Sequence, residues 1–211
     1  MRNLGLERIA YFQNRRDEVP NQELARELTQ KQDRAGIREI AAGLHHKNPN
    51  VQSDCIKVLY EIGYLNPEPI AEYVDDFLDL LKSRNNRLVW GGMIALSTIA
   101  GIKAEAIYRR LGEVQRAIEK GSVITVDSGV KVLAVVAARS EEHRKQIFPY
   151  LLNHLRTCRP KDVAQHAEKV LVAVNGENKD EFIEALGKRL ASLKSSEVAR
   201  VRKVIREAEK R

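Results

Sequence analysis

The sequence predicts an all-α fold, an α-solenoid of about five helical hairpins behind an N-terminal helical cap. Two observations lead to this prediction: apolar residues recur with a period near 37, and within each period they fall on one stripe of a helix. A third observation is that only residues 122–126 are rich enough in β-branched side chains to suggest a strand. Because that stretch runs directly into a helical stripe, we expect it to begin a helix.

The second helix of each unit is recognised by an anchor residue with a repeated surrounding pattern. In chain order the anchors are Leu59, Leu96, Leu133, Leu171 and Ile205. Apolar residues also stand one position before and three positions after every anchor, and the residue four before it is mostly small. These offsets share one helical face, so we expect five amphipathic helices that are buried on the same side.

The first helix of each unit repeats as well. Its stripe begins with Ile37, Ile40 and Leu44, returns in the next three units at the same period, and has a looser fifth copy at Phe182, Leu186 and Leu190. Each unit is therefore a pair of antiparallel helices, neither of which can bury its apolar face without neighbouring units.

These periods divide the chain into an N-terminal cap and a repeat array. Residues 1–32 do not follow the period and should form two short helices, near 4–14 and 21–31, that cap the open end of the stack. The array covers residues 33–211, with units of about 33–66, 67–102, 103–139, 140–175 and 176–211. Asn66 and Ser140 read as helix N-caps, and 48–50 and 85–86 as tight turns. Without a low-complexity linker, one continuous domain is expected.

Composition excludes several classes of protein. The 36 basic and 29 acidic residues give a net charge of +7, and the excess of basic residues lies within residues 103–211. Two distant cysteines do not suggest a disulfide framework, so we expect a cytoplasmic protein. The N-terminus is too polar for a signal peptide, and the sequence has no apolar run long enough to span a membrane.

Enzyme signatures are absent from the sequence. It has no nucleophile elbow, phosphate-binding loop, dinucleotide fingerprint, H-E-x-x-H or C-x-x-C motif, so we expect neither catalysis nor a cofactor. His154 and Cys158 lie four residues apart on one helix face, with His166 after the following turn as a third metal-ligating residue. Two suitable residues on a helix do not make a site, so the sequence analysis predicts no metal.

The repeated units resemble HEAT repeats of the armadillo-like α-solenoid family. The resemblance is carried by units such as residues 70–100, where a polar turn separates two apolar helices, and by Phe148-Pro149-Tyr150, where a proline lies in a first helix. It covers residues 33–211 and implies a right-handed α–α superhelix that serves as a scaffold or binding surface. The family's Val-Arg pairs and stacking Asp-Arg ladder are missing at positions such as Val51-Gln52.

In such a solenoid the second helices line the concave side, so residues opposite their buried stripe are candidates for partner contact. Two positions before the anchors stand Lys57, Ile94, Lys131, Lys169 and Lys203. Trp90 lies one turn from Ile94, and Arg87 borders the row. We interpret these residues as a groove with an apolar centre and a basic rim. The alternative is that the lysines only fill exposed helix positions and that Trp90 packs against a neighbouring unit.

The function that this pattern favours is a non-catalytic scaffold whose concave face holds a partner protein or an acidic peptide. One alternative is sequence-independent nucleic-acid binding through the basic residues 103–211. A less favoured alternative is a HEAT-like DNA glycosylase, because Trp90 and Asp127 occupy equivalent places in neighbouring units.

Overall fold

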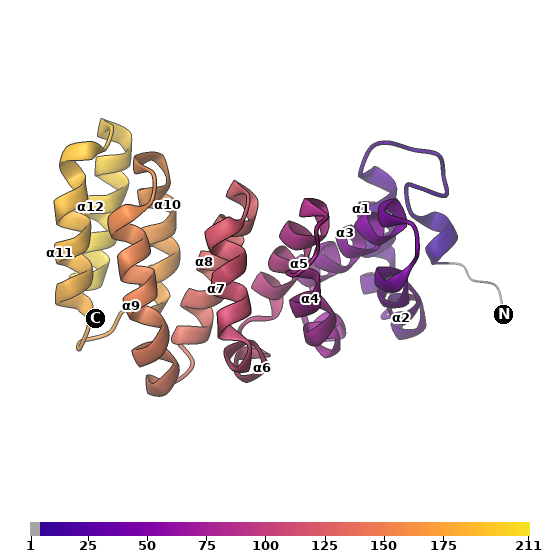
Figure 1. Ribbon diagram of the computed structural model, residues 1–211, viewed down its shortest axis with the longest axis horizontal. Helices are drawn as coiled ribbons and strands as arrows, with labels where there is room; N and C mark the ends of the chain where they lie inside the picture. Colours follow the sequence, from indigo (N-terminus) through magenta and orange to yellow (C-terminus); the bar gives the residue numbers. More distant parts are fainter. Residues whose placement is uncertain (1–4) are drawn as a thin grey trace. The chain divides into compact units, whose positions relative to one another are not determined.

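The computed structural model describes residues 5–211, and within this range it contains helices and no strand (Figure 1). This confirms the all-α repeat architecture that the sequence predicts. The helices form two compact units, Met1–Gly129 and Val130–Arg211, whose boundary falls inside α8 (Val123–Ala137). Residues 122–126 therefore begin a helix, as expected.

The first unit has two layers of helices. One layer consists of α1 (Val19–Gln30), α3 (Pro49–Leu65) and α5 (Asn86–Ile99), which pack side by side in that order. The other layer consists of α2 (Arg34–Ala42), the 3-10 helix η3 (Glu68–Tyr73) with α4 (Val74–Leu80), and α6 (Ala104–Arg109), followed by α7 (Leu111–Lys120). Because α2 packs on α3 and α4 packs on α5, these pairs are the first two hairpins.

The second unit repeats the arrangement with four helices. They are α9 (Glu141–Thr157), α10 (Pro160–Val170), α11 (Lys179–Arg189) and α12 (Ser195–Glu209). Helix α9 packs against α11 and α10 packs against α12, so first helices contact first helices and second helices contact second helices. Short 3-10 turns extend α2, α10 and α11, at Gly43–His45, Leu171–Ala173 and Leu190–Ser192.

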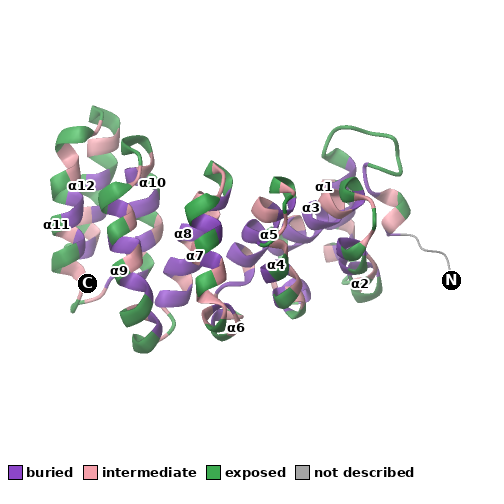
Figure 2. Ribbon diagram, viewed as in Figure 1, coloured by how far each residue is buried: buried purple, intermediate pink, exposed green. Residues whose placement is uncertain are grey.

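The predicted apolar stripes form the core (Figure 2). Leu59, Leu96 and Leu133 have no exposed surface, whereas Leu171 and Ile205 are only half-buried. Leu171 departs from the pattern because α10 ends at Val170, and the 3-10 turn that follows has three residues per turn rather than 3.6.

The small residue four before the anchor has a steric cause in the second hairpin. A Cβ atom on Gly92 would lie 2.9 Å from the carbonyl oxygen of Phe77 and 3.0 Å from Cβ of Leu80. Glycine therefore lets α5 approach α4 closely enough for the two apolar stripes to interdigitate.

The N-terminal cap differs from the prediction. The helix expected over 4–14 is wrong within the described residues: only Leu6–Arg8 forms a 3-10 turn, and the chain then continues as turns to Asn14, which has a φ of 52°. Leu4 lies outside the described residues. The second expected helix exists as α1. Residues 12–18 lack an apolar stripe, and backbone N–H groups at Ala10 and Tyr11 bond to side chains of α1 and α3 instead.

Ser140 is a helix N-cap as the sequence predicts, and Asn48 and Asn85, in the segments predicted as tight turns, are N-caps as well. Asn48 accepts a hydrogen bond from the backbone N–H of Asn50, Asn85 from that of Arg87, and Ser140 from that of His143. Asn66 accepts one from Glu68, but the segment that it opens is 3-10 rather than α-helical.

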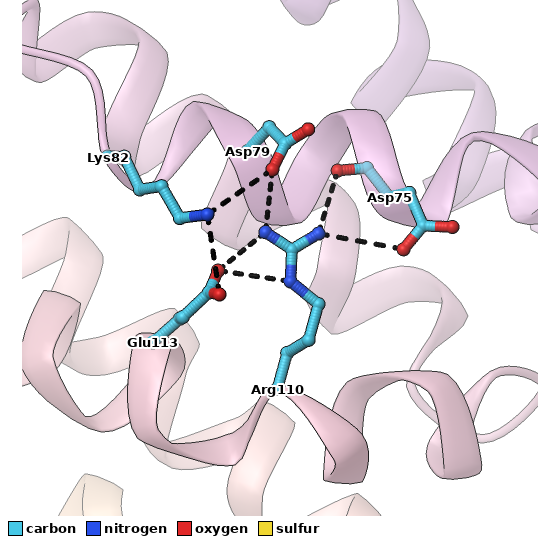
Figure 3. Close-up of polar contacts among 5 residues, drawn as sticks. All are labelled: Asp75, Asp79, Lys82, Arg110 and Glu113. Carbon is cyan, nitrogen blue, oxygen red and sulfur yellow. Dashed lines mark hydrogen bonds and ion pairs between the residues drawn. The ribbon is translucent and has the colours of Figure 1, made fainter.

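An ionic cluster joins the second hairpin to the third (Figure 3). Arg110, between α6 and α7, places Nη2 2.6 Å from Oδ1 of Asp79 on α4 and 2.6 Å from Oε2 of Glu113 on α7. Its Nη1 lies 3.6 Å from Oδ1 of Asp75, and Lys82 approaches Glu113 at 3.3 Å. The second helices carry no Asp-Arg ladder in the sequence, but here ion pairs connect the first helices of adjacent hairpins.

Loss of the Arg110 guanidinium should destabilise the chain in a pH-dependent way. Hydrogen bonds from Arg110 hold the pKa of Asp79 and of Glu113 below their usual ranges. A carboxyl with a lowered folded-state pKa adds stability above its unfolded-state pKa, and this stability disappears as the pH falls through the folded-state value. Arg110→Met should therefore lower the unfolding free energy by about 1 kcal/mol at pH 7 and by progressively less as the pH falls below about 4.

Urea unfolding of the wild type and of Arg110→Met, at pH 7 and at pH 3, measures this difference in unfolding free energy. Arg109→Met is the matched control, because Arg109 is exposed and forms an ion pair with Glu105 of its own helix. An Arg110→Met deficit of equal size at both pH values would show that the ion pairs contribute nothing.

Candidate functional site

The first unit contains a cleft with a volume of about 540 Å³. One wall is the N-terminal segment Ala10–Glu18, and the other is formed by the N-terminal halves of α3 and α5. Among the side chains that line it are Tyr11, Arg16, Asn50, Lys57, Arg87 and Trp90. The fold therefore brings together three residues that the sequence analysis selects, Lys57, Arg87 and Trp90, and adds a segment that lies outside the repeats.

Trp90 belongs both to the cleft and to the packing between hairpins. It is half-buried, and its ring centroid lies 6.2 Å from that of Tyr60 on α3, with a tilt of 56°. One part of the indole thus packs on the preceding hairpin while another lines the cleft. The contact with Tyr60 agrees with the interpretation that Trp90 packs against a neighbouring unit, and partner contact by Trp90 stays a prediction.

Lys57 is a buried, paired lysine rather than part of an exposed rim. Its residue exposure is 8%, and Nζ lies 2.7 Å from a carboxylate oxygen of Glu18 and 2.7 Å from one of Glu61. Burial lowers the pKa of this ammonium, but hydrogen bonds to Glu18, Glu61 and Tyr60 outweigh burial, so the pKa lies above its usual value. Lys57 consequently fastens Glu18, which precedes α1, to α3.

Ile94 is also covered, with 8% exposure, although the sequence analysis expects it to be the exposed apolar centre of the groove. That expectation of exposure is wrong because it treats each second helix as having a single buried stripe. In the stack, α5 packs against α3 in its own layer as well as against α4 in the other layer, so a larger part of its circumference is buried.

A polar network holds the N-terminal wall of the cleft in place. Asn21, 1% exposed, accepts a hydrogen bond from the Ala10 N–H at 2.9 Å and donates to Oδ1 of Asp54 at 2.9 Å. The second carboxylate oxygen of Asp54 accepts the Tyr11 N–H at 2.7 Å. The repeat pattern of the sequence does not predict this network, because the contacts of Asp54 join segments more than 30 residues apart outside the repeat period.

The available charge at the cleft is carried by two arginines. Arg15 pairs with Asp17, whereas Arg16 and Arg87 are exposed, and neither side chain has a hydrogen bond or ion pair to any residue in 5–211. Because guanidinium groups present donors in a planar fork, both are free to pair with carboxylates of a ligand.

The remaining residues of the predicted row lie in the second unit. Lys131 on α8 and Lys169 on α10 are half-buried and have interaction partners within the chain, and Lys203 on α12 is exposed. Asp127 on α8, half-buried and also with a partner, is not among the residues that line the Trp90 cleft. The glycosylase alternative, which requires Trp90 and Asp127 in one site, therefore stays a prediction.

The second unit does bring His154, Cys158 and His166 together. Nε2 of His154 lies 2.9 Å from Nδ1 of His166, and burial lowers the pKa of His154 to about 4. Cys158, at the C-terminus of α9, is half-buried, and burial raises the pKa of its thiol.

Comparisons with known proteins define the fold. No protein-family model matches the sequence, and no curated protein matches it. Among solved structures, an engineered protein is 19% identical with a TM-score of 0.67 over 100% of this chain and 98% of its own. A designed armadillo repeat protein in complex with the peptide (KR)4 is 16% identical, with a TM-score of 0.67, covering 99% of this chain and 98% of its own.

A karyopherin bound to a SUMO protease is 12% identical with a TM-score of 0.65, and the match covers 95% of this chain and 22% of the karyopherin. The chain therefore has the fold of the armadillo/HEAT-like repeat proteins, as its resemblance to HEAT repeats implies. Within residues 5–211, no helix combines the length and the apolar content that crossing a bilayer requires.

Removal of the Asp54 carboxylate should release the N-terminal wall of the cleft. Asp54→Ala leaves the Tyr11 N–H and the Asn21 amide without their acceptor, and the loss of a hydrogen bond to a charged group costs about 1.5–3 kcal/mol, less where water can replace the acceptor. We expect hydrogen exchange at Ala10 and Tyr11 to accelerate at least about tenfold, while exchange in α9–α12 stays unchanged.

Hydrogen-exchange mass spectrometry of the full chain measures this effect, with Asp180→Ala in the exposed first turn of α11 as control. Unchanged exchange at residues 10–18 in Asp54→Ala would mean that Asp54 does not hold the segment.

Proposed function

We propose that this protein is a non-catalytic binding scaffold whose first unit holds an extended, acidic segment of a partner protein. The observation that carries the proposal is the cleft of about 540 Å³, where Trp90 and Tyr11 offer aromatic surface beside the unpaired guanidinium groups of Arg16 and Arg87. Tryptophan and arginine are the residue types that most often dominate binding energy at protein interfaces.

The polar lining suits an extended main chain. Asn14 and Asn50 line the cleft and are exposed, and a side-chain amide can donate to a peptide carbonyl and accept from a peptide N–H. A bound segment would then be oriented by amide contacts, anchored on Trp90, and selected by carboxylates that reach the two arginines.

The solved structures of similar fold support a binding role and suggest a difference in charge preference. One is a designed repeat protein in complex with (KR)4, a basic peptide, and another is a set of designed repeats for modular peptide recognition. In the present cleft the acidic side chains Asp17, Glu18 and Asp54 are already engaged by partners within the chain, while Arg16 and Arg87 have none among residues 5–211. The free charge is therefore positive, which favours an acidic ligand.

Nucleic-acid binding through residues 103–211 has less support. Many basic side chains of the second unit pair with carboxylates, including Lys145 with Glu141, Arg159 with Asp162, Lys188 with Glu184, Arg200 with Glu168, and Lys210 with Glu207. Such pairs reduce the local positive potential on which phosphate binding depends. Oligonucleotides therefore serve as a comparison ligand in the test.

A peptide array tests the proposal. It contains peptides of equal length with graded Asp and Glu content, and a matched series with graded Lys and Arg content. The strongest acidic peptide is then titrated while the emission of Trp90, the single tryptophan, is recorded. We expect saturable binding to acidic peptides, weakened about tenfold or more by Arg87→Glu and by Trp90→Ala, because charge and anchor contacts are lost.

Lys161→Glu is the matched charge-reversal control, since Lys161 is exposed in the second unit. Circular dichroism establishes that Trp90→Ala remains folded. Equal affinity of wild type and Arg87→Glu for the acidic peptide, or preference for oligonucleotides with a steep salt dependence, would contradict the proposed function.

A further inference from the structure

The junction between α9 and α10 gathers three side chains of the types that bind transition metals. His154 lies in the last turn of α9, Cys158 directly follows that helix, and His166 lies in the second turn of α10. The first two are four residues apart, so they share one face. One ligand atom from each of the three residues can be chosen so that all lie within 4.8 Å of one another.

The spacing is close to that of a tetrahedral zinc site. With Zn–N distances of about 2.0–2.1 Å and a Zn–S distance of about 2.3 Å, neighbouring ligand atoms lie about 3.3–3.7 Å apart. The two imidazole nitrogens, now 2.9 Å apart, would separate slightly, and the thiol would approach them. Side-chain rotations that move the ligand atoms by about 1 Å supply both adjustments.

Contacts around the three residues fix the backbone that carries them. Arg189 of α11 donates hydrogen bonds to the carbonyl oxygens of Leu155, Arg156 and Cys158, at 3.0, 2.6 and 2.7 Å. These bonds satisfy carbonyls at the C-terminus of α9 and hold the turn that presents the thiol. His166 is 3% exposed and lies on the inner side of the three-residue cluster. His154 and Cys158 are half-buried, so a metal ion can reach the cluster from their side.

Metal binding requires both imidazoles to be neutral. In a neutral pair that shares one hydrogen bond, one of the two facing nitrogens carries the accepting lone pair, and a tautomer change provides a lone pair on the other. The thiol proton would pass to solvent when the sulfur becomes a metal-bound thiolate.

We propose that His154, Cys158 and His166 bind one zinc ion, with the fourth coordination position left to water or to a ligand from outside the chain. Two imidazoles and a thiolate suit zinc and its spectroscopic substitute cobalt, whereas magnesium and calcium require oxygen ligands. This site lies in the second unit and is independent of the peptide cleft in the first.

Titration of the reduced, untagged full chain with Co²⁺ tests the proposal, because a cobalt–thiolate bond gives a charge-transfer band in the near ultraviolet. We expect one Co²⁺ per chain, that band together with intense visible bands of tetrahedral cobalt, and displacement by Zn²⁺ but not by Mg²⁺. Cys158→Ser should abolish the thiolate band, and His154→Gln should weaken zinc binding at least about tenfold.

The buried thiol provides the matched control. Cys55 has no exposed surface, so Cys55→Ala should leave the cobalt spectrum unchanged. Because His154 and Cys158 are half-buried, their substitution could affect folding. Thermal unfolding of the metal-free variants therefore checks that each variant is folded. Absence of a thiolate band at saturating Co²⁺, or a band that persists in folded Cys158→Ser, would overturn the proposal.

Discussion

The structure depends on one constraint: no helix of this chain can bury its apolar stripe alone. The helices are amphipathic and mostly short, and isolated helices of such length have only marginal stability in water. A helix is stabilised instead by its neighbours in the stack, and within the first unit α3 contacts α1, α2 and α5 together. This requirement explains the period of the sequence, the close approach that Gly92 permits, and the burial of Ile94 and Lys57 on a face that a free helix would expose.

The same constraint locates the cleft. Before the first hairpin, the segment 10–18 forms no regular helix and is held by polar contacts to α1 and α3. Buried polar groups that are fully paired give a fixed conformation, because every alternative leaves a donor or acceptor unsatisfied. The cleft beside Trp90 thus arises where periodic apolar packing gives way to a specific polar network.

The periodic part of the fold could be predicted from the sequence, and the part without a period could not. Anchors such as Leu59 and Leu96 report helix faces directly, since a buried stripe repeats with the helical period. Helix–helix contact on two sides is not encoded in the pattern of one helix, so the exposure of Ile94 and Lys57 was predicted wrongly. The approach of His166 to His154 and Cys158 depends on how α10 turns back along α9, which spacing alone does not give.

An acidic peptide should bind between the N-terminal segment 10–18 and the start of α3 and α5. NMR tests this binding site directly. The uniformly labelled full chain is titrated with an acidic peptide selected from the array, and the chemical-shift perturbation of the backbone amides is recorded. We expect perturbed amides to cluster in residues 10–18, 50–57 and 87–90 and the Trp90 indole N–H resonance to shift. Perturbations confined to residues 130–211, with residues 10–18 and Trp90 unchanged at saturation, would contradict it.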